Sequence, residues 1–252
     1  PEALIRQSLR NGLSDGWGGS MCGTEFSDVL FGTPKPIDTE ANLGVMVAEN
    51  VNIVVHGHDP SLSEMICEVA DDPEMIAYAK EMGAKGITIS GVCCTSNEVA
   101  MRRGIPMAGN FLQQENVVLT GACEAIVVDV QCIFPALGPL SKCFHTKFIT
   151  TSPIAQMPDS DYIEFSAGTA LEKAKEIVKT AIENFKNRKP DLVYIPDMKQ
   201  KATVGYSVEA IVKTLDGVTN SQVDKTGTTK PLVDCITSGV IRGAVAMVGC
   251  NN

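Results

Sequence analysis

The sequence has 252 residues, of which 44% are hydrophobic, so the chain can form a packed core and is not disordered as a whole. Lys and Arg number 21 and Asp and Glu number 30, which gives a formal net charge of −9. An acidic surface repels phosphate backbones and anionic lipid headgroups, so we expect neither nucleic-acid binding nor membrane insertion. No apolar run has the length of a bilayer span, and residues 1–11 lack the order of a secretory signal, which favours a cytoplasmic protein.

Hydrophobic periodicity predicts the elements in chain order. A helical pattern over residues 1–13 is followed by a glycine-rich stretch at 16–20, which predicts a connector. From residue 50 onward, short β-branched runs alternate with segments of helical period, which is typical of parallel strands covered by helices. The predicted strands are 53–55, 87–89, 125–128, 148–150 and 240–248. The predicted helices are 61–82, 95–103, 111–119, 167–188, 207–215 and 231–238.

This order predicts an α/β fold in three parts. Residues 1–45 are expected to end a preceding helical domain and form a connector, and 46–200 to form a central Rossmann-like domain with a parallel sheet. Residues 201–252 are expected to start a second Rossmann-like domain. One strand cannot form a parallel sheet, so we expect the sequence to be part of a longer chain.

The cysteines are the first chemical feature that needs an explanation. Nine cysteines without an export signal favour reduced thiols or metal thiolates over disulfides. Predicted strands run into His56-Gly57-His58, Cys93-Cys94, Gln131-Cys132 and Cys250. The carboxyl ends of parallel strands share one edge of a sheet, where ligands bind. We therefore expect three thiolates and an imidazole to converge there.

Thiolates and imidazole bind iron–sulfur clusters, zinc and other thiophilic metals. The sequence has no Cys-x-x-Cys pair of the kind common at structural zinc sites, so dispersed single ligands favour a multinuclear cluster. Three acidic residues are candidates to orient ligands or carry protons, although ordinary helix-face or cap roles are equally open: Glu98, Glu115 and Asp129.

Structural interpretations compete with these roles. Free cysteine is often buried, so five cysteines are interpreted as core residues: Cys22, Cys67, Cys123, Cys143 and Cys235. His56 and His145 are open to a structural, hydrogen-bonded interpretation. A cysteine protease pairing Cys94 with His58 or His145 lacks any local signature, and no phosphate-binding glycine loop occurs.

Several motifs resemble one family in its own order over nearly the whole chain. They are HGHDP at 56–60, GVCCTSNE at 91–98, RGIP at 103–106, DVQCI at 129–133, HTK at 145–147, GYSVEAI at 205–211 and the segment 241–252. These motifs resemble anaerobic nickel–iron carbon monoxide dehydrogenase. Ser96 stands where relatives of that family commonly have glycine.

The resemblance implies a homodimer whose subunits carry an amino-terminal helical domain and two Rossmann-like domains. It implies interconversion of CO and water with CO2, two protons and two electrons at a nickel–iron–sulfur cluster of the Ni-4Fe-4S type. Carried over by motif, His58 and Cys94 would hold an iron outside the cubane, and Cys132 and Cys250 would hold irons of the cubane. His58 is favoured over His56 because the family's ligand is the second histidine of this run.

The resemblance places the remaining machinery outside this sequence. The nickel-binding cysteine and the lysine and histidines that act as acid and base are expected elsewhere, so no catalytic acid or base is assigned here and this chain alone is expected to be inactive. Additional 4Fe-4S clusters would pass electrons to a ferredoxin-like carrier. Association with an acetyl-CoA synthase or with a hydrogenase stays open.

Two alternatives remain beside the dehydrogenase. A hybrid-cluster-type hydroxylamine reductase would require carboxylate ligands, and it leaves the Cys-Cys and Gln-Cys motifs unexplained. A metal-free α/β scaffold would place the cysteines in its core.

Overall fold

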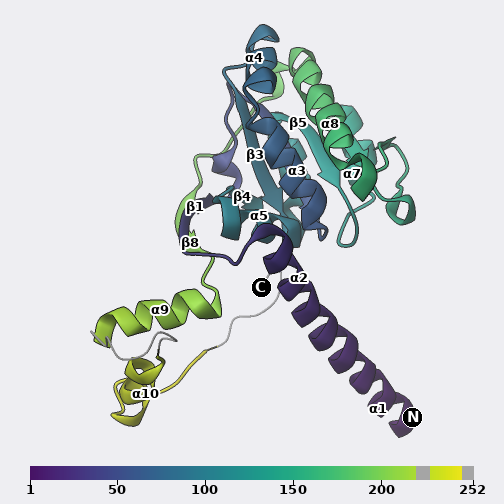
Figure 1. The fold of residues 1–252 in the computed structure, drawn as a ribbon. Helices are drawn as coiled ribbons and strands as arrows, with labels where there is room; N and C mark the ends of the chain where they lie inside the picture. The colour runs from purple at the N-terminus through teal and green to yellow at the C-terminus, as the bar shows by residue number, and fades with distance from the viewer. Residues whose placement is uncertain (220–227, 246–252) are drawn as a thin grey trace.

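A computed structural model describes residues 1–219 and 228–245 (Figure 1). In this part of the chain the strands form one eight-stranded sheet in the order β7-β6-β5-β2-β3-β4-β1-β8. Neighbouring strands pair in parallel except β1 and β8, which pair antiparallel. The strands are β1 (Ile37–Ala41), β2 (Val51–Gly57), β3 (Ile87–Val92), β4 (Met107–Gly109), β5 (Cys123–Val128), β6 (Lys147–Thr150), β7 (Asp161–Tyr162) and β8 (Gln200–Val204). The predicted α/β class with a largely parallel sheet is confirmed.

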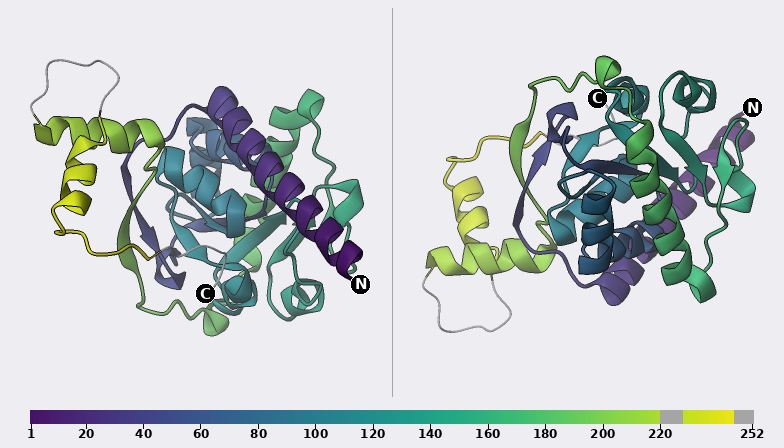
Figure 2. Two further views of the ribbon diagram at one scale, coloured as in Figure 1. Left: turned by 90° about the horizontal axis from the view of Figure 1, so that it is seen from below. Right: turned by 90° about the horizontal axis from the view of Figure 1, so that it is seen from above.

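Helices cover both faces of this sheet. The α-helices are α1 (Glu2–Asn11), α2 (Gly19–Phe31), α3 (Pro60–Ala70), α4 (Pro73–Glu81), α5 (Cys93–Arg103), α6 (Gln114–Leu119), α7 (Leu137–Cys143), α8 (Ala170–Asn184), α9 (Val208–Thr219) and α10 (Lys230–Thr237). Figure 2 shows α9 and α10 beyond the β1–β8 edge of the sheet, on the side away from α8. Among the described residues, no helix has both the length and the apolar character needed to cross a membrane.

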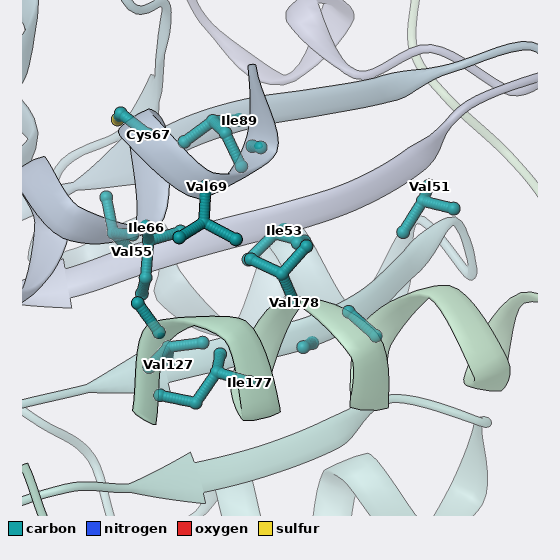
Figure 3. Close-up of a cluster of buried hydrophobic side chains, with 14 of the residues drawn as sticks. Val51, Ile53, Val55, Ile66, Cys67, Val69, Ile89, Val127, Ile177 and Val178 are labelled. Carbon is teal, nitrogen blue, oxygen red and sulfur yellow. The ribbon is translucent and has the colours of Figure 1, made fainter. Parts of the chain in front are cut away.

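The central strands are buried on both faces. Val51, Ile53 and Val55 of β2 pack with Ile66 of α3 and Ile177 of α8 in one hydrophobic cluster (Figure 3). Successive side chains of a strand point to opposite faces, so the intervening positions of β2 and β5 face a second cluster.

Val54 and Ile126 lie in that second cluster with Val118 of α6 and Leu137 of α7. Every residue of β2 and of β5 is buried. Burial of each large apolar side chain contributes about 1.5–3 kcal/mol, so the middle of the sheet is the most strongly stabilised part of the fold.

The predicted connector comprises the glycine-rich stretch 16–20 and the Gly-Pro stretch 32–36; it is wrong at 16–20, where the structure is helical, whereas 32–36 forms neither helix nor strand. A π-helix spans Gly12–Gly18 and joins α1 to α2 (Figure 1). Gly18 and Gly19 adopt right-handed helical backbone angles, with φ of −63° and −64°. Glycine disfavours a helix only by its conformational freedom, and here the helical hydrogen bonds of its neighbours outweigh that cost.

The predicted helix over 61–82 is divided into α3 and α4. Pro73 lacks an N–H and clashes with the preceding turn, so it starts a new helix instead of continuing the old one. The Asp72 carboxylate accepts a hydrogen bond of 2.9 Å from the Glu74 backbone N–H and caps α4. Similarly, the Ser207 hydroxyl caps α9 by accepting a hydrogen bond of 3.1 Å from the Ala210 N–H.

Two strand assignments, one near each end of the chain, differ from expectation. Residues 240–245 form no strand, in contrast to the first part of the predicted strand 240–248, and Val240 and Val245 are 75% and 90% exposed; residues 246–248 lie outside the described part of the chain. β1, which the sequence pattern did not predict, pairs with β8 over five residue pairs. The predicted domain boundaries at 45/46 and 200/201 stay predictions. β1 lies before the first boundary and β8 crosses the second, and both strands are hydrogen-bonded into the same sheet as β2.

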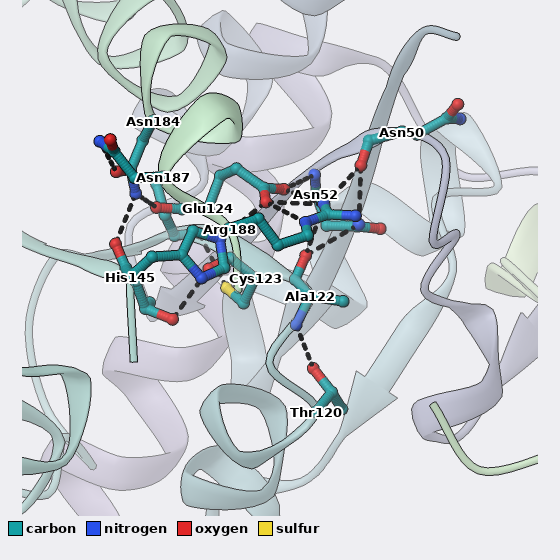
Figure 4. Close-up of polar contacts among 12 residues, drawn as sticks. Asn50, Asn52, Thr120, Ala122, Cys123, Glu124, His145, Asn184, Asn187 and Arg188 are labelled. Carbon is teal, nitrogen blue, oxygen red and sulfur yellow. Dashed lines mark hydrogen bonds and ion pairs between the residues drawn. The ribbon is translucent and has the colours of Figure 1, made fainter. Parts of the chain in front are cut away.

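A buried polar network closes the amino-terminal edge of the sheet (Figure 4). Glu124 of β5 is fully buried and accepts hydrogen bonds of 2.7 Å from Arg188 Nε and Nη2. It also accepts from the Asn52 backbone N–H at 2.6 Å and contacts His145 Nε2 at 2.8 Å. Asn184 at the end of α8 donates to the carbonyls of Glu124 and His145. The structural interpretation of His145 therefore agrees with its place in the structure.

The network predicts a large effect of Arg188→Ala. Removal of the guanidinium would leave the Glu124 carboxylate buried without its cation, which costs about 3–5 kcal/mol. We expect a marked increase in amide hydrogen exchange over β5, measured by mass spectrometry. Arg6→Ala is the matched control, because Arg6 pairs with Glu2 on the exposed surface of α1. Equal exchange in the two variants would contradict a stabilising role for the network.

Candidate metal centre

Three of the four predicted ligand positions follow the carboxyl ends of adjacent parallel strands. β5, β2 and β3 are neighbours in the sheet, and His58, Cys94 and Cys132 come directly or a few residues after them. A parallel bridge between Gly57 and Cys93 continues the pairing of β2 and β3 to this edge. His58 Nε2 lies 3.9 Å from Cys132 Sγ, so the structure brings together one imidazole and one thiol of the predicted three thiolates and imidazole. Cys250 lies outside the described residues.

The Asp129 carboxylate holds the turn after β2 beside the turn after β5. Its Oδ1 accepts from the His58 backbone N–H at 2.5 Å and from the Val130 N–H, and its Oδ2 accepts from the Asp59 N–H at 3.0 Å. Burial raises the pKa of Asp129 to about 6, while these backbone N–H groups lower it. Asp129 was one of three candidates to orient ligands, and the structure places it in contact with the backbone of His58.

Gly57 permits this close approach. Its φ is +126°, a conformation that residues with a Cβ rarely adopt. A Cβ at this position would overlap the Asp129 carboxyl group. A glycine is therefore required between the two histidines both by the backbone angle and by the space left for Asp129.

The two histidines of the run have different environments. His58 Nδ1 lies 3.0 Å from the Val130 carbonyl oxygen, which can only accept, so Nδ1 carries the hydrogen and donates it. This leaves the lone pair of His58 Nε2 facing Cys132 and available to a metal, the arrangement in which a backbone carbonyl orients a histidine ligand. His56 is 1% exposed, its Nε2 lies 2.9 Å from Gln114 Oε1, and burial lowers its pKa to about 4.

Cys94 lies in the first turn of α5, next to a cavity of about 400 Å³. Partial burial raises the pKa of the Cys94 thiol, and the carboxylates of Glu98 and Asp129 raise it further. The positive end of α5 acts in the opposite direction, because unpaired N–H groups at a helix start favour a thiolate. Glu98 already pairs with Arg102, so a bound cation would chiefly offset Asp129, and this environment suits a thiolate that binds a metal.

Backbone strain is concentrated at the same edge. Cys93, Gln131 and Cys132 have φ values of +68°, +63° and +57°. Residues with a Cβ seldom occupy this left-handed region, and where they do the surrounding contacts enforce it. Strain on both cysteine-bearing turns indicates that their geometry is fixed by function or packing rather than by local preference.

The predicted core role of the other cysteines is correct for two of them. Cys67 and Cys123 are buried, and burial raises the pKa of Cys67 to about 12 and that of Cys123 well above its ordinary value. Cys22 and Cys143 are exposed and Cys235 is half-buried, so the core prediction is wrong for these three. Their helices present these positions outward, which a composition rule for cysteine cannot detect.

Three comparisons with known proteins identify the family of the whole chain. Residues 1–252 match the Prismane/CO dehydrogenase family. The chain belongs to that family. It is 53% identical over 249 residues to carbon monoxide dehydrogenase 1 of Methanosarcina mazei, which covers 99% of this chain and 38% of that relative. The chain thus spans well under half the length of the curated relatives it matches.

Two solved structures agree with this assignment. A nickel-free carbon monoxide dehydrogenase from Thermococcus sp. AM4 matches all of this chain and 38% of its own, with a TM-score of 0.93 at 52% identity. A structure of acetyl-CoA synthase/carbon monoxide dehydrogenase, described by its NiZn[Fe4S4] and NiNi[Fe4S4] clusters, matches 91% of this chain and 33% of its own, with a TM-score of 0.84 at 45% identity.

The donor set fits a family cluster better than a single ion. Within residues 1–219 and 228–245, no group of three or more His, Cys, Asp or Glu side chains is close enough together to hold one metal ion. Two soft donors, His58 and Cys132, converge, and Cys94 follows the next strand. Candidate donors on neighbouring strand ends, too few of them close together for one ion, suit a polynuclear group better than a single ion.

The turn after β2 predicts the effect of Gly57→Ala. The substitution adds left-handed strain of about 1–2 kcal/mol and pushes Asp129 away, so it should displace His58. We expect a lower thermal unfolding midpoint and less iron bound after anaerobic reconstitution. Gly83→Ala is the control, because Gly83 also has a positive φ, +97°, but no atom lies near its missing Cβ. Iron binding equal to that of Gly83→Ala would contradict the role of Gly57.

Proposed function

We propose that the protein containing this chain is an anaerobic carbon monoxide dehydrogenase. One observation supports this more than any other: in a chain of this family, His58 Nε2 and Cys132 Sγ lie 3.9 Å apart at the edge where the strand before Cys94 also ends. The substrates are CO and water and the product is CO2, with the protons and electrons released. Because the chain spans 38% of its relatives, the activity is proposed for the whole protein and not for these residues alone.

The cofactor we propose is a nickel–iron–sulfur cluster of the Ni-4Fe-4S type, with further 4Fe-4S clusters in the whole protein. Its ligands from this chain are His58, Cys94, Cys132 and Cys250, the last outside the described residues. When bound, the cluster supplies the metal and redox centre for the oxidation of CO by water. Thiolate and imidazole donors match this thiophilic group. The acidic groups near Cys94 favour the positive charge of the metal ions.

The residues of this chain have a positioning task. The Val130 carbonyl orients His58 by accepting from Nδ1, and Asp129 fixes the backbone of His58 through its N–H. The Nε2 atom of His56 is already engaged by the Gln114 amide. These contacts favour His58 over His56 as the ligand. No acid or base for the protons of the reaction is assigned to this chain.

The partners follow from the same proposal. We propose a homodimer in the cytoplasm of an anaerobe, with electrons passed to a ferredoxin-like carrier. One relative named above combines acetyl-CoA synthase with carbon monoxide dehydrogenase, which supports that association for some members of the family. An acetyl-CoA synthase and a hydrogenase both remain candidate partners of this protein.

Metal analysis tests the proposal directly. The full-length protein, purified and reconstituted without oxygen, should contain nickel and iron and oxidise CO with a viologen acceptor. Iron without nickel, together with hydroxylamine reduction and no CO oxidation, would support the hybrid-cluster alternative. Absence of both metals would support the metal-free scaffold.

Substitution of single cysteines tests the ligand set. Cys94→Ala and Cys132→Ala should each reduce CO oxidation by about 100-fold or more, because loss of one ligand alters the metal's coordination as well as its charge. The iron content and the electron paramagnetic resonance spectrum should change with the activity. Cys143→Ala is the control, because Cys143 is an exposed thiol of α7. Wild-type activity in Cys94→Ala would remove Cys94 from the ligand set.

A further inference from the structure

Gln114, the first residue of α6, is fully buried and uses all the hydrogen-bonding capacity of its amide. Its Oε1 accepts from the Phe134 backbone N–H at 2.8 Å and lies 2.9 Å from His56 Nε2. Its Nε2 donates to the Phe111 carbonyl at 2.5 Å and to the Cys132 carbonyl at 2.9 Å. One side chain thus joins α6, the end of β2 and the turn that carries Cys132.

The backbone partners determine which way round this amide lies. Phe134 offers an N–H and must face oxygen, whereas the carbonyls of Phe111 and Cys132 must face nitrogen. Since Oε1 can only accept, His56 carries its hydrogen on Nε2 and donates it to Gln114. His56 is therefore committed to the amide by hydrogen bonding as well as by burial.

Gln114 contacts the turn at residues 131–134 from the opposite end to Asp129. Asp129 binds the Val130 N–H at the start of the turn, and Gln114 binds the carbonyl of Cys132 and the N–H of Phe134. Between them Gln131 and Cys132 have left-handed backbone angles. A strained turn held at both ends keeps its thiol in one place, which a turn held at one end does not.

We propose that Gln114 is a positioning residue that fixes Cys132 for cluster binding through the backbone of its turn. It does not touch the cluster, and the link to the cluster rests on the proposed function. Glutamate cannot replace it, because a carboxylate has no N–H for the carbonyls of Phe111 and Cys132 and would bring a charge into a fully buried position.

The test uses the full-length protein in its metal-free form, with hydrogen exchange of residues 131–136 and of β5 read by mass spectrometry. Gln114→Met keeps the length of the side chain and removes all four polar contacts. Gln114→Glu keeps an oxygen for the Phe134 N–H and loses both donors. Asn116→Asp is the control, because it adds the same charge to the exposed face of α6.

We expect Gln114→Met to accelerate exchange over residues 131–136 by at least about tenfold, with β5 unchanged, since tenfold corresponds to one net hydrogen bond of about 1.4 kcal/mol. Gln114→Glu should give a smaller increase at Phe134, and Asn116→Asp none. Wild-type exchange in Gln114→Met would overturn the inference. Acceleration that extends over β5 would also overturn it, because Gln114 would then be a general core residue.

A second readout connects the turn to the cluster. After reconstitution, Gln114→Met should bind less iron than Asn116→Asp and show an altered electron paramagnetic resonance spectrum. An unchanged spectrum despite a loosened turn would overturn the link to the cluster. If the wild-type protein itself takes up no iron, the proposed function fails, whereas the exchange data still decide whether Gln114 fixes the turn.

Discussion

The hydrogen bonds to the Asp129 carboxylate are the interaction on which the rest of the candidate site depends. Backbone N–H groups from the turn after β2 and from the turn after β5 meet at this one side chain. Parallel pairing brings the ends of the two strands to the same edge, but it leaves the backbone groups of the turns beyond them unpaired. Asp129 satisfies several of these groups at once, and the missing Cβ of Gly57 leaves room for it. His58 and Cys132 owe their approach to this arrangement.

The two edges of the sheet differ in their polar contacts and in their backbone geometry. At the amino-terminal edge the Glu124 and Arg188 pair is buried and hydrogen-bonded, and it ties the segment after α8 to the central strands. At the carboxyl edge the polar groups hold turns, and non-glycine residues take left-handed backbone angles. Between the edges, burial of β2 and β5 on both faces supplies the stability that such strain requires. The buried centre of the sheet therefore supplies the stability that permits strained backbone conformations at its carboxyl edge.

The sequence pattern predicted what depends on local signals. The β-branched runs identified β2, β3, β5 and β6, and their alternation with helices predicted the shared edge that brings His58 near Cys132. β1 was not predicted, because its residues lack an apolar run and it is a strand by virtue of its pairing with β8 and β4. Gln114 was missed for a similar reason: nothing in the run around it shows that its amide meets a turn 18 to 20 residues later. Contacts distant in sequence decide both cases.

The electrostatics of the carboxyl edge favour a cation over a set of free thiols. Burial and two carboxylates raise the pKa of Cys94, and burial raises the pKa of Asp129 to about 6. The Cys94 thiol therefore tends to keep its proton when no metal is bound. A bound metal ion would reverse this preference, because it binds the thiolate form of cysteine and nearby carboxylates stabilise its positive charge. Acidic groups that would make Cys94 a poor nucleophile thus make it a suitable ligand, which is why the same residues argue against a cysteine protease and for a metal centre.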